Sequence, residues 1–175
     1  MKSIVVDNFF DDFSIIKESI KQIPLYNLEE YKTKFNRPDV GHWPGMRSDF
    51  LENSQPFLFA LIMKEFNTKY GNVFNGRPAK IWSHTHLRLS KDEPLDYVHA
   101  DHPASDYSFL IYISNTNLNS GTGLYDNNSN LINDIKFVEN RSLLFDSRYL
   151  HRSIGNHGNN VNDGRLTINI FFKFK

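Results

Sequence analysis

The sequence predicts a mainly β fold of the sandwich or jelly-roll type, with flanking helices on its N-terminal side. After about residue 80, short segments rich in β-branched and aromatic residues follow one another, and clusters of Gly, Asn, Asp and Pro separate them. No segment with a helical period interrupts this half, which argues against a parallel α/β sheet. The predicted strands are residues 80–89, 107–114, 135–138, 142–145, 151–154 and 165–174.

The N-terminal part shows one short strand pattern and two helical patterns. Residues 3–6 predict an edge strand, and apolar residues at steps of three and four between Phe13 and Ile23 predict an amphipathic helix. A second helix is expected between a capping Ser54 and Gly71. Its expected buried face is formed by Leu58, Leu61, Ile62 and Phe66.

Two segments lack a regular period. Residues 115–133 are expected to connect two strands through a tight turn at Gly121-Thr122-Gly123, since no helical pattern follows that would favour a phosphate-binding loop. Residues 25–53 contain several Pro and Gly and are expected to form an irregular excursion that covers or shapes a site. The residues of this segment expected to shape a substrate pocket are His42, Trp43 and Arg47.

Length and composition restrict the function classes. The 175 residues suit a single domain, in which residues 1–79 form a helical lead-in and substrate-side segment and residues 80–175 the jelly-roll core. Twenty basic and twenty acidic residues cancel, which removes the long-range field of a general nucleic-acid binder. Because cysteine is absent, any metal must be held by His, Asp and Glu. No stretch has the length of a membrane span or the apolar core of a signal peptide, so we expect a soluble cytoplasmic protein.

The strongest chemical signal is a set of potential metal ligands. Residues i and i+2 of an extended segment project from the same face, so His99 and Asp101 can meet one ion. His151 opens a later strand and can supply a third ligand. Two His and one carboxylate with open positions are the ligand set of non-haem Fe(II) oxygenases. His84 and His86 have the same i, i+2 spacing but no acidic companion, and are interpreted as packing or surface residues.

The last strand carries a cation on an otherwise apolar segment. Alternation places Arg165 and Thr167 on one face and the Leu and Ile residues on the other. A buried guanidinium needs an anion, and a dicarboxylate cosubstrate would supply one through bidentate hydrogen bonds. A salt bridge to Asp146 or Asp163 is the alternative at this stage.

Five motifs in order resemble the Fe(II)/2-oxoglutarate-dependent dioxygenases, in their prolyl-hydroxylase-like branch. The resemblance covers about residues 80–175 and implies a double-stranded β-helix, or jelly roll. It also implies Fe(II) as cofactor and 2-oxoglutarate as cosubstrate, which dioxygen converts to succinate and CO2 while a substrate C–H bond is hydroxylated. The motifs are DYVHAD (96–101), FLIYISN (109–115), SGTGLY (120–125), RSLLFDSRYLHRS (141–153) and GRLTINIFF (164–172).

The resemblance assigns roles to six residues. His99, Asp101 and His151 fall on the iron ligands, and Arg165 falls on the arginine that binds the 2-oxoglutarate tail. Thr167 and Tyr112 fall on positions that support that tail in some members. Phe171 stands where alkylation-repair members have a second arginine, so a nucleic-acid substrate is not expected.

The sequence leaves the substrate open. A protein or peptide side chain and a small molecule are both compatible with it, and the oligomeric state is undetermined. The alternative function is a cupin-like or degenerate jelly roll that binds a metal or a small acid without oxygenase activity.

Overall fold

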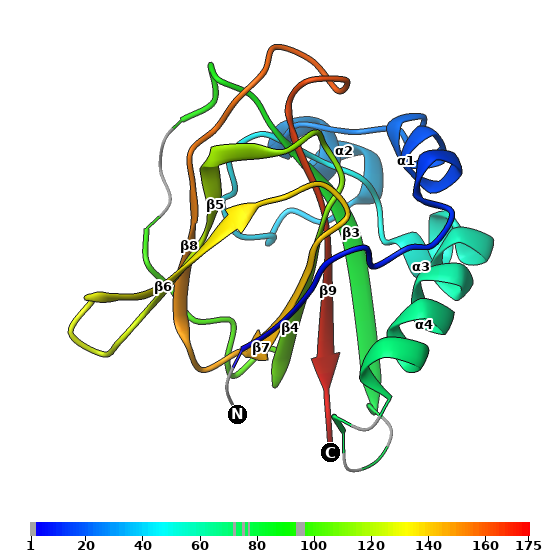
Figure 1. Ribbon diagram of the computed structural model, residues 1–175. Coiled ribbons are helices and arrows are strands. Elements are labelled where there is room, and N and C mark those ends of the chain that lie inside the picture. The colour runs from blue at the N-terminus through cyan, green and yellow to red at the C-terminus, as the bar shows by residue number, and fades with distance from the viewer. Residues whose placement is uncertain (1–2, 72, 75, 77, 94–96) are drawn as a thin grey trace.

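A computed structural model describes residues 3–71, 73–74, 76, 78–93 and 97–175 and contains two antiparallel β-sheets (Figure 1). The larger sheet has the strand order β1-β7-β4-β9-β3-β2, and the smaller has the order β6-β5-β8. The predicted mainly β jelly roll with flanking helices is confirmed. Residues 1–2 of the segment inspected for a signal peptide, and Asp96 of the DYVHAD motif, lie outside the described residues.

The elements occupy most of the described chain. The larger sheet consists of β1 (Ile4–Val6), β7 (Ser142–Asp146), β4 (Tyr107–Tyr112), β9 (Arg165–Lys173), β3 (Lys80–Arg88) and β2 (Met46–Arg47). The smaller sheet consists of β6 (Leu131–Phe137), β5 (Asn117–Tyr125) and β8 (Leu150–Ile154). The helices are α1 (Phe13–Lys21), α2 (Leu28–Phe35), α3 (Leu51–Ser54) and α4 (Pro56–Tyr70).

The two sides of the larger sheet have different partners. Helices α1, α3 and α4 lie against one side, and the smaller sheet lies on the other (Figure 1). On the helical side, Ile62 and Phe66 of α4 pack with Phe109 and Phe172 of the sheet in one large apolar core. A second apolar cluster, which includes Tyr112, Leu124 and Phe145, joins strands of both sheets. The larger sheet is therefore packed against helices on one side, and on its other side it faces the smaller sheet, where a site can form between the two sheets.

Alternation along β9 produces this division. Leu166, Ile168, Ile170 and Phe172 are buried in the helical-side core, as the sequence predicts. Arg165, Asn169 and Phe171, with the opposite phase, line a cavity between the sheets. The edge position predicted for residues 3–6 is also confirmed, because β1 stands at one end of the strand order of the larger sheet and pairs with β7.

The prediction that residues 25–53 are irregular is wrong. They contain α2, the short β2 and α3. Helix α2 begins with a capping box, in which the Asn27 side chain accepts from the Glu30 N–H and the Glu30 carboxylate accepts from the Asn27 N–H. This reciprocal pair satisfies two otherwise unpartnered donors and is a sufficient local signal for a helix start. The high density of Pro and Gly after residue 37 obscured it.

Two details of helix α4 differ from prediction. Ser54 is the last residue of α3, where its hydroxyl donates to the Phe50 carbonyl, and Gln55 precedes α4 as its N-cap residue. Leu61 is 48% exposed, whereas Leu58, Ile62 and Phe66 are buried as expected. No helix in the described part of the chain is long and apolar enough to cross a membrane.

Gly121-Thr122-Gly123 is not a turn but the interior of strand β5. A Cβ atom at Gly121 would lie 2.2 Å from the Ile135 carbonyl oxygen of β6, so this close approach of two backbones requires glycine. The turn between β5 and β6 lies further on, where the Asp126 carboxylate accepts from the N–H groups of Asn128 and Asn130. An Asx-type turn replaces the expected glycine turn.

Asn140 should be a large contributor to stability, because it fixes the N-terminal segment to the sheet. Its buried side chain accepts from the Phe10 N–H and donates to the Phe10 carbonyl, both at 2.9 Å. We expect Asn140→Ala to lower the free energy of unfolding by about 2–4 kcal/mol in urea denaturation, since two buried backbone groups lose their partners. The exposed substitution Asn127→Ala is the control. A loss as small as the control's would contradict the assignment.

Candidate metal centre

A two-residue β-bridge brings the two predicted histidine ligands together. His99 and His151 are antiparallel partners outside the named strand ladders. The His99 N–H donates to the His151 carbonyl at 3.0 Å, and the His151 N–H donates to the His99 carbonyl at 2.7 Å. Directly opposite residues project their side chains to the same face. The imidazole centroids consequently lie 4.4 Å apart.

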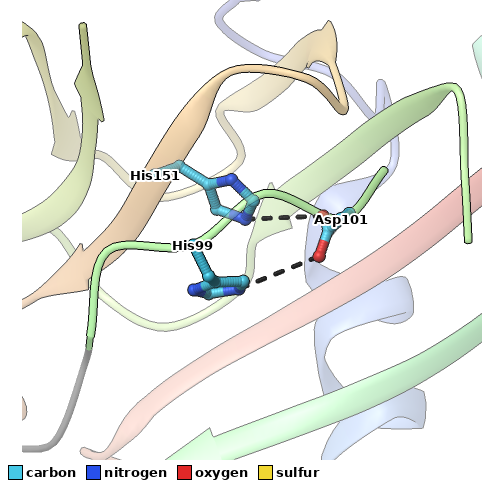
Figure 2. Close-up of side chains that lie close together, drawn as sticks. All are labelled: His99, Asp101 and His151. Atoms are coloured by element: carbon cyan, nitrogen blue, oxygen red, sulfur yellow. Dashed lines mark ion pairs between the residues drawn. The ribbon is translucent and has the colours of Figure 1, made fainter. Parts of the chain in front are cut away.

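Asp101 completes the group from the same side. Its Oδ1 lies 3.8 Å from His99 Nε2, and its Oδ2 lies 3.4 Å from His151 Nε2 (Figure 2). One potential ligand atom from each of the three residues lies within 4.8 Å of the other two. The structure therefore brings together the three side chains that the sequence proposed as one ligand set.

Both imidazoles are oriented in the same way by the backbone. His99 Nδ1 lies 3.0 Å from the Tyr97 carbonyl oxygen, and His151 Nδ1 lies 3.1 Å from the Tyr149 carbonyl oxygen. A carbonyl can only accept, so each Nδ1 carries a proton, and a neutral ring in this orientation presents its Nε2 lone pair toward Asp101. Burial lowers the pKa of His151, which favours the neutral ring that a metal requires.

The carboxylate of Asp101 is held by a buried hydroxyl that sequence analysis missed. Ser108 Oγ on β4 donates to Asp101 Oδ2 at 2.6 Å and is also 2.8 Å from Ser147 Oγ. No sequence motif singles out Ser108. Its orientation toward Asp101 can be deduced only once it is known which face of the sheet each residue of β4 occupies. Such outer hydrogen bonds fix the orientation of a ligating carboxylate.

The three residues fit a metal of the non-haem iron type. Two neutral imidazole nitrogens and one carboxylate oxygen converge from one side, and the rest of the coordination sphere is left to small molecules. This set is the facial arrangement that suits Fe(II) with open positions. A structural zinc site would need a fourth protein ligand, and no further acidic or imidazole group joins the cluster among the residues described.

The triad opens into a cavity of about 140 Å³ between the sheets, which we call the first cavity. Arg165 lies in its lining, together with Leu110 of β4 and Thr122 of β5. The Arg165 side chain is 2% exposed, donates to the Gly121 carbonyl at 3.1 Å and lies over the Phe137 ring at 5.6 Å. A guanidinium therefore shares one small cavity with the potential metal ligands.

The two acids considered as partners for Arg165 have other roles. Asp146 binds the Arg148 guanidinium at 2.5 and 2.9 Å. The Asp163 carboxylate accepts from the N–H groups of Asn159 and Asn160. The alternative of a salt bridge from Arg165 to one of these residues is therefore not what the structure contains.

Thr167 and Tyr112 lie beside Arg165 but behind the cavity wall. They are antiparallel partners, and both are fully buried. The Thr167 hydroxyl lies 3.0 Å from Asn169 Oδ1, and the Tyr112 hydroxyl donates to Thr122 Oγ1 at 2.7 Å. Asn169 and Thr122 themselves line the cavity, so each predicted residue reaches it through a neighbour.

His84 and His86 are not surface residues. Both are buried on the cavity-facing side of β3, and His86 Nε2 lies 2.7 Å from the Pro44 carbonyl oxygen. Burial lowers both pKa values well below the usual histidine value, with a further contribution from Arg47, so both rings are neutral. The three residues nominated from segment 25–53 line the first cavity, and their part in a substrate pocket stays a prediction; they are His42, Trp43 and Arg47.

Comparisons with known proteins agree with this fold. No protein-family model matches the sequence, and no curated protein matches it. An oxidoreductase of the 2OG-Fe(II) oxygenase family from Burkholderia pseudomallei has a similar structure, with a TM-score of 0.69, 11% identity, and coverage of 98% of this chain and 84% of that one.

Two further structures extend the comparison. A prolyl hydroxylase from Trichoplax adhaerens, in complex with a peptide fragment of hypoxia inducible factor, gives a TM-score of 0.55 at 15% identity, over 98% of this chain and 83% of that one. HygX from Streptomyces hygroscopicus, with nickel and 2-oxoglutarate bound, gives a TM-score of 0.60 at 13% identity, over 98% of this chain and 82% of that one. The chain has the fold of 2-oxoglutarate oxygenases, including prolyl hydroxylases.

Ser108 offers a test of the metal centre that leaves its three ligands in place. We expect Ser108→Ala to weaken binding of Mn(II), a redox-stable substitute for Fe(II), by about 10- to 100-fold, since Asp101 loses the group that orients it. Isothermal titration calorimetry measures the affinity. Ser120→Ala removes a buried hydroxyl of β5 that binds the Gly155 carbonyl and should leave the affinity unchanged. Equal affinities in both variants would show that Ser108 does not position a ligand.

Proposed function

We propose that this protein is an Fe(II)- and 2-oxoglutarate-dependent dioxygenase that hydroxylates a substrate with release of succinate and CO2. The observation that carries the proposal is the convergence of His99, Asp101 and His151 in the same enclosed cavity as the Arg165 guanidinium. A guanidinium beside a metal centre suits a cosubstrate that carries a carboxylate. The fold similarity to 2-oxoglutarate oxygenases supports the same class.

In this proposal each residue has a defined task. His99 Nε2, His151 Nε2 and one Asp101 oxygen hold Fe(II), and Ser108 keeps the carboxylate in position. When bound, the iron supplies the activation of dioxygen that a protein side chain cannot provide. The walls of the cavity exclude water, which protects the reaction from side paths.

Arg165 is proposed to bind the carboxylate of 2-oxoglutarate that lies far from the metal. A guanidinium matches a carboxylate with two parallel hydrogen bonds, and the enclosed site strengthens them. Tyr112 is proposed to support this end through Thr122, and Thr167 through Asn169, in line with the hydrogen bonds between these pairs. Their contribution is positioning, because neither lies in the cavity lining.

We further propose that residues 1–175 act as one catalytic domain. The helical-side core contains Phe9, Ile20 and Ile62 from the N-terminal part together with Ile168 and Phe172 from the last strand. Segment 25–53 contributes Trp43 and Arg47 to the cavity, which supports its proposed role on the substrate side.

Turnover of 2-oxoglutarate tests the proposed activity directly. With Fe(II) and dioxygen, we expect the protein to convert 2-oxoglutarate to succinate, slowly without its substrate and faster with it. His99→Ala should reduce succinate formation and iron binding to background, because a ligand is lost. His102→Ala, which alters the adjacent exposed imidazole, should retain both. If His99→Ala and the wild type bind iron equally well, the assigned centre is wrong.

Arg165→Met separates the oxygenase from a cupin-like binder. N-oxalylglycine, a 2-oxoglutarate analogue, should raise the melting temperature only when Mn(II) is present. Arg165→Met should weaken binding of N-oxalylglycine by about 30-fold or more, since loss of a buried charge partner costs about 2–5 kcal/mol. The same substitution should leave the affinity for Mn(II) unchanged. Indifference of the wild type to the analogue, with Mn(II) bound, would favour the alternative function.

A further inference from the structure

A second cavity adjoins the proposed metal centre and is not used by the proposed cosubstrate. It has a volume of about 340 Å³, at the lower end of the range of small-molecule sites, which is about 300–1,000 Å³. The two cavities share a boundary formed by His42, Trp43, Arg47, Asp101 and Phe171. A molecule in the second cavity would therefore lie next to the ligand Asp101.

The walls of the second cavity are largely aromatic. Trp82 and Phe171 stack face to face with their centroids 5.4 Å apart, and Tyr31 packs edge-on against Trp43 at 5.2 Å. Phe50 lies on the same lining. Such a surface favours a flat or apolar molecule over an extended polar chain.

Arg47 is a cation on this boundary that forms no salt bridge with any of the described residues. Its guanidinium lies over the Trp43 ring at 4.5 Å, and its side chain makes no hydrogen bond or ion pair within the described part of the chain. Burial lowers the pKa of Arg47 to about 10, partly offset by the attraction of Asp101, so the side chain remains charged at neutral pH. In the proposed function the charge of Asp101 is committed to the metal, which leaves Arg47 to another anion.

Two further polar groups near Arg47 are enclosed without a partner. Trp43 Nε1 and His84 Nε2 make no hydrogen bond to any residue that the structure describes, and both residues line the second cavity. Buried polar atoms in native proteins normally have partners. Their concentration around Arg47 indicates a wall that is completed by a ligand with acceptor atoms.

We propose that the second cavity binds the primary substrate, and that this substrate is a small organic acid with an aromatic or apolar body whose carboxylate pairs with Arg47. This inference rests on the proposed function and names its substrate class. The aromatic walls would hold the body, and the shared boundary would bring it to the open side of the metal centre. A free acid fits the volume of this cavity better than a polypeptide backbone with its flanking residues.

Intrinsic fluorescence reports occupancy of this cavity directly, because both tryptophans of the chain, Trp43 and Trp82, line it. The probes are phenylacetate and its neutral counterpart phenylacetamide, titrated into protein loaded with Mn(II) and N-oxalylglycine so that Arg165 is already engaged. We expect saturable quenching by phenylacetate and at least about tenfold weaker binding of phenylacetamide, since a charge-assisted bond is lost. Equal binding of acid and amide, or no quenching by either, would overturn the proposal.

Variants of Arg47 separate ligand binding from a structural role. Arg47→Met should abolish the preference for the acid and leave the melting temperature equal or higher, because an unpaired, partly buried charge is removed. Arg47→Lys should bind the acid with intermediate strength, since it keeps the charge without the planar fork. Lys64→Met, at an exposed cation of helix α4 that lines neither cavity, is the control. An unchanged preference in Arg47→Met, or a marked fall in its melting temperature, would contradict the proposal.

The same phenylacetate titration, carried out without metal, distinguishes a failure of the proposed acid site from a failure of the proposed dioxygenase function. In the Arg165→Met variant without Mn(II), the second cavity remains and the proposed cosubstrate anchor is absent. Quenching by phenylacetate that persists there, together with failure of N-oxalylglycine to bind the wild type, would retain the acid site and reject the dioxygenase. Loss of the acid preference with normal N-oxalylglycine binding would reject the acid site alone.

Discussion

The antiparallel bridge between His99 and His151 is the contact on which the candidate centre depends. Two backbone hydrogen bonds, of 3.0 and 2.7 Å, set the segment after residue 97 beside β8 and force both imidazoles to the same face. The i+2 position of Asp101 then follows from extended geometry. The main chain orients the two imidazoles through the Tyr97 and Tyr149 carbonyls, and the Ser108 hydroxyl orients the Asp101 carboxylate.

The pairing of β3 with β9 arranges the residues that line the two cavities beside the metal ligands. The register places Trp82 opposite Phe171, His86 opposite Thr167 and Arg88 opposite Arg165, so one face of the two strands carries the aromatic and basic groups that line the cavities. The other face of the same strands is buried against the helices. A single alternation therefore separates the residues that stabilise the fold from those that meet small molecules.

Much of this arrangement follows from sequence patterns, and the exceptions have physical causes. The phase of β9 can be predicted because apolar Leu166, Ile168 and Ile170 alternate with polar Thr167 and Asn169. The cluster of His99, Asp101 and His151 was predicted from spacing and resemblance. The strand character of Gly121 was hidden, since a glycine required by the approach of the Ile135 carbonyl looks the same in sequence as a turn glycine. The role of Ser108 depends on a tertiary contact that no local pattern encodes.

The neighbouring positions of Arg88 and Arg165 on paired strands have a consequence for the way the two sheets are joined. Both side chains are almost fully buried, and each donates a hydrogen bond to a strand of the smaller sheet. Arg88 of β3 donates to Ser153 Oγ of β8 at 2.7 Å, and Arg165 of β9 donates to the Gly121 carbonyl of β5 at 3.1 Å. The two guanidinium groups therefore act as polar cross-links between the sheets, so a substitution at either arginine alters the spacing of the layers as well as the charge of the first cavity.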